Sequence, residues 1–195
     1  MTVQTIHTRS MSVDLKTRAA QGDEQEDFVI EGYFALFNTE TELFPGFREQ
    51  ILPGAFDNAL NDDIRALIDH DRSKVLGRTK SKTLELSVDS RGLFGTIKVN
   101  KDDRDAMNLY QRVKRGDVDQ CSFGFWVVDE DYKHFEDGSV RSDIKDLKLL
   151  EVSVVTFPAY EDTSVSARAK DVEEFKKKAL DAKKSRLKER MSKWH

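Results

Sequence analysis

The 195-residue chain has little of several residue types on which whole classes of protein depend. Its single cysteine, Cys121, cannot form an internal disulfide or build a thiolate-rich zinc or iron–sulfur site, so the chain suits a reducing cytosol. It has no run of about 18 apolar residues, which excludes a predicted membrane-spanning helix. Residues 1–18 also lack an apolar segment, so we expect no secretory signal.

The sequence also lacks a strong charge of one sign. The 36 acidic and 32 basic residues leave a formal net charge of -4, which gives no general attraction to nucleic acid. Only the segment from Lys170 to Lys193 is locally basic, so nucleic-acid binding would depend on that tail and is not expected to be the function. The chain has no glycine-rich phosphate loop or dinucleotide fingerprint, and we expect no cofactor.

Composition divides the chain into three parts. Residues 1–27 are polar and end in an acidic stretch with little apolar surface, so we expect a flexible lead. Residues 28–168 carry the strand patterns and are expected to form the folded domain. Residues 169–195 are expected to form a basic amphipathic helix, with Asp171 and Glu174 placed as an N-terminal capping pair.

Strand patterns dominate the folded part. Alternating or β-branched runs predict strands over residues 28–37, 64–68, 84–88, 93–99, 120–128 and 147–157. A helix is predicted over residues 102–115, which precede Gly116, and a shorter one over residues 54–60. Residues 130–139 are predicted to form a polar loop. The fold class is therefore α+β and mainly β, with a few helices around the sheet.

Ser122 is a candidate nucleophile. If residues 120–128 form a strand, Ser122 and Gly124 share one face, and a glycine beside the hydroxyl would let a peptide approach it. The segment lacks the Gly-x-Ser-x-Gly elbow of α/β-hydrolases, which disfavours that mechanism. An ordinary strand serine is the alternative interpretation of this local pattern.

His70 is the candidate base for such a serine. A serine hydroxyl needs a base to take its proton, and histidine has the most suitable pKa. Of the four histidines, only His70 lies beside a predicted core strand. A surface histidine at a strand end is one alternative. A metal site at Asp69-His70-Asp71 is another, although no further ligands stand at a recognisable spacing.

Glu151 is the one acidic residue in the apolar run from Leu149 to Val155. A carboxylate in a core strand must be paired or face a site, so Glu151 is a candidate to orient a histidine. It could also face solvent on a one-sided sheet. Ser153 would lie on the same face as Glu151 and is a rival nucleophile, ranked below Ser122.

Several segments taken together resemble the HK97-type prohead proteases, relatives of the herpesvirus assemblins, over most of residues 28–168. The matching segments are Glu31-Gly32-Tyr33-Phe34-Ala35-Leu36-Phe37-Asn38, Leu52-Pro53-Gly54-Ala55-Phe56, the region of His70 with Leu76-Gly77-Arg78-Thr79, Gly116-Asp117 through Cys121-Ser122-Phe123-Gly124-Phe125, and Leu150-Glu151-Val152-Ser153 through Thr156-Phe157-Pro158-Ala159-Tyr160.

This resemblance implies a serine endopeptidase with Ser122 as nucleophile and His70 as general base. The third member varies in the wider group, and Glu151 occupies the matching strand here. The resemblance further implies an assemblin-like β-barrel sheet surrounded by helices and a tendency to form homodimers. From the residues themselves we expect neither a cofactor nor a metal. Capsid and scaffold proteins would be the substrates, in the host cytoplasm and inside the prohead. The protein could also cleave itself, at the boundary from Ser164 to Arg168. A noncatalytic scaffold or capsid-assembly factor with the same fold is the alternative.

Overall fold

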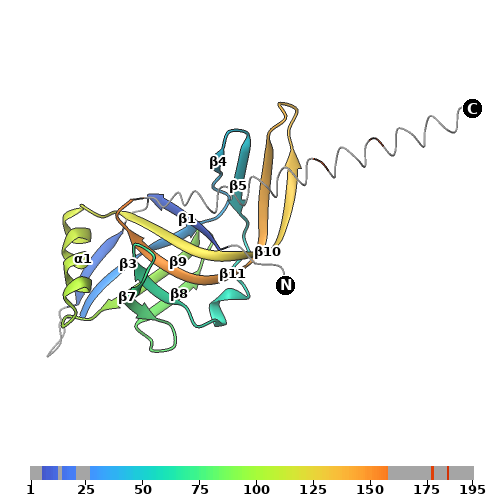
Figure 1. Ribbon diagram of the computed structural model, residues 1–195. Coiled ribbons are helices and arrows are strands. Elements are labelled where there is room, and N and C mark those ends of the chain that lie inside the picture. Colours follow the sequence, from blue (N-terminus) through green and yellow to red (C-terminus); the bar gives the residue numbers. More distant parts are fainter. Residues whose placement is uncertain (1–5, 13–14, 21–26, 158–176, 178–183, 185–195) are drawn as a thin grey trace, which may run out of the picture. The chain divides into compact units, whose positions relative to one another are not determined.

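A computed structural model describes residues 6–12, 15–20, 27–157, 177 and 184 (Figure 1). The predicted boundary at residue 168 lies outside the described residues. So does the predicted helical tail at 169–195, except for Lys177 and Lys184.

Strands make up most of the described chain, as the sequence predicts. They are β1 (His7–Ser12), β2 (Lys16–Ala20), β3 (Asp27–Leu36), β4 (Thr41–Phe44), β5 (Phe47–Ile51), β6 (Arg65–Ile68), β7 (Asp71–Arg78), β8 (Leu84–Val88), β9 (Gly92–Val99), β10 (Gln120–His134) and β11 (Val140–Val155). One α-helix, α1 (Arg104–Arg115), and one 3-10 helix, η1 (Ala59–Asn61), complete the described elements. The mainly-β prediction is confirmed.

The strands form two sheets. In the first sheet the order is β1-β10-β11-β5-β4, with β6 paired to β11 and β7 paired to β6. The second sheet has the order β2-β3-β9-β8. The long strand β11 pairs in parallel with β5 through its first part and with β6 through its last part. Within the described residues neither sheet closes on itself, so strand pairing there does not form a closed barrel.

The core contains apolar side chains from both sheets. The rings of Phe123 and Phe125 on β10 stack at 4.9 Å between centroids, and Phe123 also meets Phe56 at 5.8 Å. These side chains and Phe34 of β3 belong to one buried cluster. Because Phe123 and Phe125 face this cluster, the intervening Gly124 and the preceding Ser122 belong to the other face of β10.

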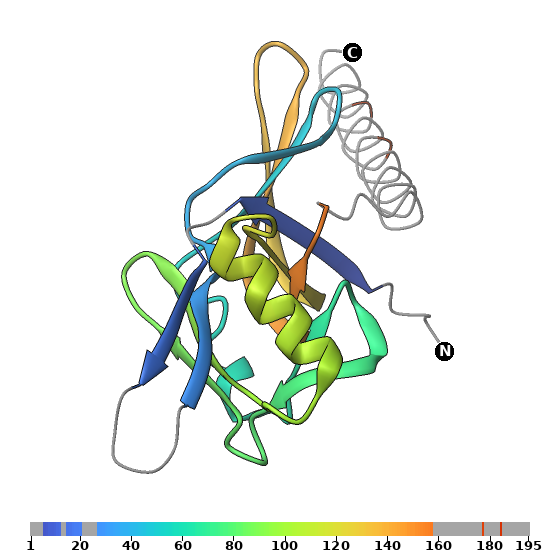
Figure 2. The same cartoon turned by 90° about the vertical axis from the view of Figure 1, so that its left-hand side faces the viewer.

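Helix α1 lies against the second sheet (Figure 2). Its Tyr110 packs edge-on against Phe28 of β3. Asp103 caps its first turn by accepting hydrogen bonds from two backbone N–H groups, and Gly116 ends it in the left-handed conformation. The predicted helix is therefore confirmed. The shorter helix predicted over residues 54–60 is wrong, because turns occupy most of that segment before η1. No helix in the described ranges is long and apolar enough to cross a membrane.

The expectation of a flexible lead over residues 1–27 is wrong for the parts that the structure describes. Strand β1 pairs with β10, and β2 pairs with β3. Pairing satisfies the backbone polar groups of these segments without requiring an apolar run. Arg9 of β1 adds a buried ion pair with Glu49 of β5, with 2.6 Å between Nε and Oε1. The flanking residues 1–5, 13–14 and 21–26 lie outside the described part.

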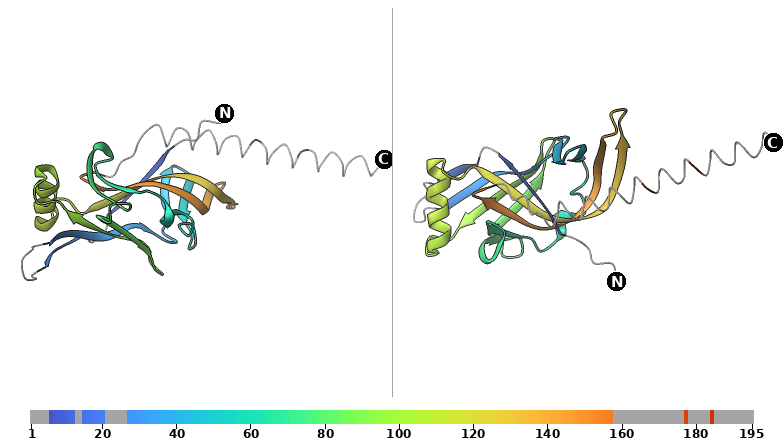
Figure 3. Two further views of the ribbon diagram at one scale, coloured as in Figure 1. Left: turned by 90° about the horizontal axis from the view of Figure 1, so that it is seen from below. Right: turned by 45° about the horizontal axis from the view of Figure 1, so that its top comes forward.

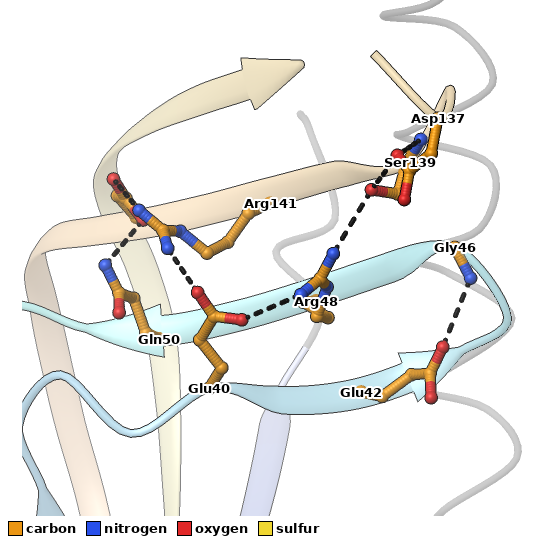
Figure 4. A network of polar contacts seen from close by, with 9 residues as sticks. Glu40, Glu42, Gly46, Arg48, Gln50, Asp137, Ser139 and Arg141 are labelled. Carbon is orange, nitrogen blue, oxygen red and sulfur yellow. Dashed lines mark hydrogen bonds and ion pairs between the residues drawn. The ribbon is translucent and has the colours of Figure 1, made fainter. Parts of the chain in front are cut away.

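The polar loop predicted over residues 130–139 is also largely wrong. There β10 continues to His134 and β11 begins at Val140, and both run beside β4 and β5 (Figures 1 and 3). We call residues 40–50 and 129–143 the arm. Its strands are joined by a polar network in which Arg141 contacts Glu40 and Asp143, and Gln50 donates to Asp143 at 2.8 Å (Figure 4). Pairs of charged side chains join these strands in place of an apolar face. The sequence therefore lacks the alternation that predicts a strand, and it suggests a loop.

Candidate active site

A two-residue turn between β6 and β7 presents His70. Ile68 and Asp71 are paired across the hairpin, and the two residues between them have positive φ angles, +49° at Asp69 and +60° at His70. Two-residue turns of type I′ require positive φ at both central positions and favour glycine at the second. A histidine in this conformation carries a backbone cost, and such strain is concentrated at functional sites.

Asp69 fixes this turn to the end of β11. Its N–H donates to the carbonyl of Val154 at 3.0 Å, and its carboxylate accepts from the Thr156 N–H at 2.7 Å and from the Thr156 hydroxyl at 3.2 Å. These three bonds hold His70 beside the strand that carries Glu151.

The two carboxylates that flank His70 in sequence have other partners. Asp69 binds Thr156, and Asp71 accepts from both the hydroxyl and the N–H of Ser73. The bonds from Ser73 lower the pKa of Asp71 from its ordinary value. Both carboxylates thus stabilise turns, which weakens the alternative that Asp69-His70-Asp71 forms a metal site.

His70 and Glu151 form a hydrogen-bonded pair. Nδ1 of His70 lies 2.7 Å from Oε1 of Glu151, and the two side chains are only 15% and 16% exposed. A carboxylate accepts hydrogen bonds, so Nδ1 is the nitrogen that donates to Glu151, and Nε2 carries a lone pair whenever the ring is neutral. Nε2 is buried and has no hydrogen-bond partner among the described residues. The structure therefore brings together two of the three predicted site residues.

The strand ladder brings Ser122 to the same neighbourhood. Ser122 lies opposite Ser153, and Gly124 lies opposite Glu151, in the antiparallel pairing of β10 with β11. Residues directly opposite in such a ladder share a face of the sheet. Ser122 is consequently a same-face neighbour of the strand segment that carries Glu151.

Gly124 has a different role from the one that its position in the sequence suggests. A Cβ atom at this position would lie 2.5 Å from Oε1 of Glu151. The space over Gly124 is therefore occupied by the Glu151 carboxylate and is not an open approach for a peptide. The absence of a side chain at residue 124 allows Glu151 to reach His70.

The Ser122 hydroxyl is fully buried and donates to the carbonyl oxygen of Arg9 at 2.9 Å. Arg9 belongs to β1, in which Ser10 is the residue paired with Ser122. The sequence does not reveal that Arg9 lies beside Ser122. Strand β1 stands within a polar segment and has no apolar alternation that would predict a strand. The contact of Arg9 with Ser122 depends wholly on the pairing of β1 with β10.

Ser153, the rival nucleophile, is bound to the acid of the pair. Its hydroxyl donates to Oε2 of Glu151 at 2.5 Å, and the residue is fully buried. The two oxygens of Glu151 thus have different partners, His70 on one side and Ser153 on the other.

Comparison with known proteins relates this arrangement to a protease family. Residues 13–178 match the family described as caudovirus prohead serine protease. The prohead protease of Enterobacteria phage HK97 is 30% identical over 160 residues, which cover 82% of this chain and 68% of that protein. The solved structure of the bacteriophage T4 capsid assembly protease has a similar fold, with a TM-score of 0.55 at 10% identity over 80% of this chain and 99% of that one. The chain therefore belongs to the caudovirus prohead serine protease family.

Proposed function

We propose that this protein is a serine endopeptidase that cleaves scaffold and capsid proteins, and its own ends, during prohead maturation. Ser122 is the nucleophile, His70 is the general base, and Glu151 orients His70. Membership of the prohead serine protease family supports the activity and the class of substrate.

The observation that carries the assignment is the His70–Glu151 pair. The 2.7 Å contact at Nδ1 fixes the ring and its tautomer, and it leaves the buried Nε2 as the nitrogen that can take a proton. A serine protease that uses a histidine base requires this combination of an oriented imidazole and a free basic nitrogen.

The proposed reaction is acyl transfer. Ser122 Oγ attacks the peptide carbonyl carbon while Nε2 of His70 takes the hydroxyl proton. As the C–N bond breaks, His70 returns that proton to the leaving amine, and water then releases the acyl group by the same route. Glu151 stays ionised throughout and stabilises the imidazolium. No cofactor takes part.

Attack requires the Ser122 hydroxyl to turn away from Arg9. A hydroxyl has one proton, which in the described arrangement is donated to the Arg9 carbonyl, so it must be redirected to His70. Catalytic hydrogen bonds often become well aligned only in the substrate complex. The complete burial of Ser122 supports our expectation that activity depends on homodimerisation or encapsidation.

The remaining parts of the proposal concern partners and location. We expect a homodimer that acts in the host cytoplasm and inside the prohead on capsid and scaffold proteins. The names of the related prohead and capsid assembly proteases support this setting. The correspondence of the two-sheet core to an assemblin-like barrel stays a prediction.

A noncatalytic scaffold or capsid-assembly factor is the second candidate. The observation that favours it is the buried Ser122 hydroxyl, which is bound to main chain and not to the base. A protein of this kind would keep the fold and would bind coat protein without cutting it.

Co-expression with the cognate capsid and scaffold proteins tests the proposal. Intact masses would be compared for the wild type, Ser122→Ala and Ser87→Ala, where Ser87 is an exposed strand serine of the second sheet and serves as the control. We expect cleavage in the wild type and in Ser87→Ala, and none in Ser122→Ala. Unchanged cleavage in Ser122→Ala would move the nucleophile elsewhere. Folded but uncleaved material in all three would favour the assembly factor.

A further inference from the structure

We propose that Ser153 is a positioning residue whose hydroxyl holds the Glu151 carboxylate in the orientation that His70 requires. This inference rests on the proposed function, in which His70 is the base and Glu151 orients it. It gives Ser153 a role different from that of a rival nucleophile.

The geometry gives each Glu151 oxygen its own partner. Oε1 accepts from Nδ1 of His70 at 2.7 Å, and Oε2 accepts from the Ser153 hydroxyl at 2.5 Å. One hydrogen bond leaves a carboxylate free to turn about its terminal torsion, which is broad in glutamate. Two bonds on opposite oxygens fix the carboxylate plane, and hence the direction in which His70 is held.

The strand explains why Ser153 can do this. Residues two apart on β11 project from the same face, so Ser153 and Glu151 are side-by-side neighbours without any turn or bulge between them. Ser153 stands in the buried, β-branched run that includes Val152 and Val154. A buried hydroxyl in such a run is costly unless it is hydrogen-bonded, and the bond to the Glu151 carboxylate meets that requirement.

The opposite strand leaves room for the arrangement. Gly124 lies opposite Glu151, and a Cβ there would meet Oε1 at 2.5 Å. Only the glycine allows the carboxylate to lie between His70 and Ser153. Three residues from two strands therefore confine Glu151: His70 and Ser153 by hydrogen bonds, and Gly124 by the space that it leaves.

The same contact explains why Ser153 is poorly suited to be the nucleophile. Its proton is donated to a carboxylate, whereas the basic Nε2 of His70 lies at the other end of the ring from Glu151. Ser122, opposite Ser153 in the ladder, donates its hydroxyl proton to the main-chain carbonyl of Arg9 and not to a carboxylate, and in the proposed mechanism it exchanges that partner for Nε2.

The test compares Ser153→Thr with Ser153→Val in the full-length protein, with Ser153→Ala as a smaller variant. Threonine and valine have the same shape and differ in the hydroxyl alone. A fluorophosphonate probe reports reactivity through the rate of covalent labelling, and peptide mapping identifies the labelled serine. Proton NMR of the His70 Nδ1–H reports the His70–Glu151 bond independently of any reaction. Thermal unfolding confirms that each variant is folded.

We expect labelling of Ser122 to fall about 10- to 100-fold in Ser153→Val and Ser153→Ala, and to return to within a few-fold of the wild type in Ser153→Thr. The downfield Nδ1–H resonance should be present in the wild type and Ser153→Thr, and shifted or lost in Ser153→Val. If the added methyl groups prevent Ser153→Thr and Ser153→Val from folding, the NMR comparison of the wild type with Ser153→Ala tests the proposal.

Equal labelling and equal resonances in the threonine and valine variants would overturn the positioning role, as would a wild-type resonance in Ser153→Ala. A probe attached to Ser153 would overturn it in favour of Ser153 as nucleophile. Failure of the proposed function would give a different result from failure of the positioning role. Ser122→Ala would then be labelled as fast as the wild type, or neither protein would be labelled. In that case the NMR resonance still shows whether Ser153 holds the His70–Glu151 pair.

Discussion

Strands β10 and β11 build two different environments along one continuous pairing. In the part that carries Ser122 and Glu151, the polar side chains make a few specific bonds, from Ser122 to the Arg9 carbonyl and from Glu151 to His70 and Ser153. In the arm the same strands carry many charges, which neutralise one another in a network around Arg141 and Asp143 (Figure 4). In the proposed mechanism the first region orients groups for chemistry, whereas the second stabilises a projecting structure by charge pairing.

The difference shows how one ladder supports two purposes. Glu151 is partly buried, and its only ion-pair partner in the described part of the chain is His70, which is charged only when protonated. In the proposed mechanism this lets Glu151 respond to proton transfer at His70. A buried carboxylate held by Arg141, Lys133 and Gln50, as Asp143 is, is permanently neutralised and contributes to stability only. Substitutions in the two regions should therefore separate activity from stability.

The largest effect is expected from Glu151→Gln. The amide keeps the size of the side chain but has no charge to stabilise the His70 cation, and its NH2 group can donate to Nδ1 and favour the wrong tautomer. We expect proteolysis to fall about 10⁴-fold, as when the acid of a serine protease triad is replaced by its amide. Initial cleavage rates of capsid or scaffold substrate would measure this. Glu85→Gln, an exposed glutamate of the second sheet, is the matched control, and a loss below about 10-fold would contradict the assignment.

Asp143→Asn should affect stability in place of activity. Among the described residues it removes one of the two carboxylates paired with Arg141, which keeps Glu40, and the one paired with Lys133. We expect the free energy of unfolding to fall by about 3 kcal/mol, because the mostly buried Arg141 is then only partly compensated. Urea unfolding measures the change, and cleavage per folded molecule should stay at the wild-type value. Asp129→Asn, which breaks an exposed pair with Lys145 on the same arm, should cost less than about 1 kcal/mol. Equal losses in the two variants would contradict the comparison.

Gly124→Ala should lower activity and leave stability nearly unchanged, and its effect on activity should be smaller than that of Glu151→Gln. The added Cβ meets Oε1 of Glu151, which is the end of a flexible side chain and can swing away. The His70–Glu151 bond is then lost with little change in packing. We expect activity to fall on the order of 10²-fold, with the free energy of unfolding changed by less than about 1 kcal/mol. Wild-type cleavage in a folded Gly124→Ala protein would show that Glu151 does not need this position.

The smallest expected effect is an acid-dependent loss of stability in the arm. Burial favours the neutral form of Asp143, but hydrogen bonds from Lys133, Arg141 and Gln50 outweigh it and lower the pKa of Asp143. A lowered folded-state pKa gives stability that is fully present above the ordinary aspartate pKa of about 4, and that is lost as the pH falls from there through the lowered value. Unfolding midpoints at a series of pH values measure this. The slope should be reduced in Asp143→Asn, and an unchanged slope would contradict the prediction.

The sequence predicts the parts of the fold that have a regular apolar pattern. Helix α1 has both its capping residue Asp103 and its terminal Gly116, and β8 and β9 alternate around a turn-forming segment. The errors lie where polar residues pair across strands. The chain between Glu130 and Ser139 looks like a loop because its charged side chains pair with residues outside the segment, as Lys133 does with Asp143 and Asp131 does with Lys145, which local sequence patterns do not reveal.

The candidate site divides in the same way. The sequence by itself singled out His70, Ser122 and Glu151, because the chemistry of a histidine at a strand end, a serine beside glycine and a lone acid in an apolar strand can be recognised from residue type and position. Only the tertiary structure decided that Glu151 meets Nδ1 of His70, and that Gly124 makes room for this carboxylate. These contacts join segments up to 81 residues apart. Their distances are fixed by strand register and by the Asp69 turn, which short-range patterns do not encode.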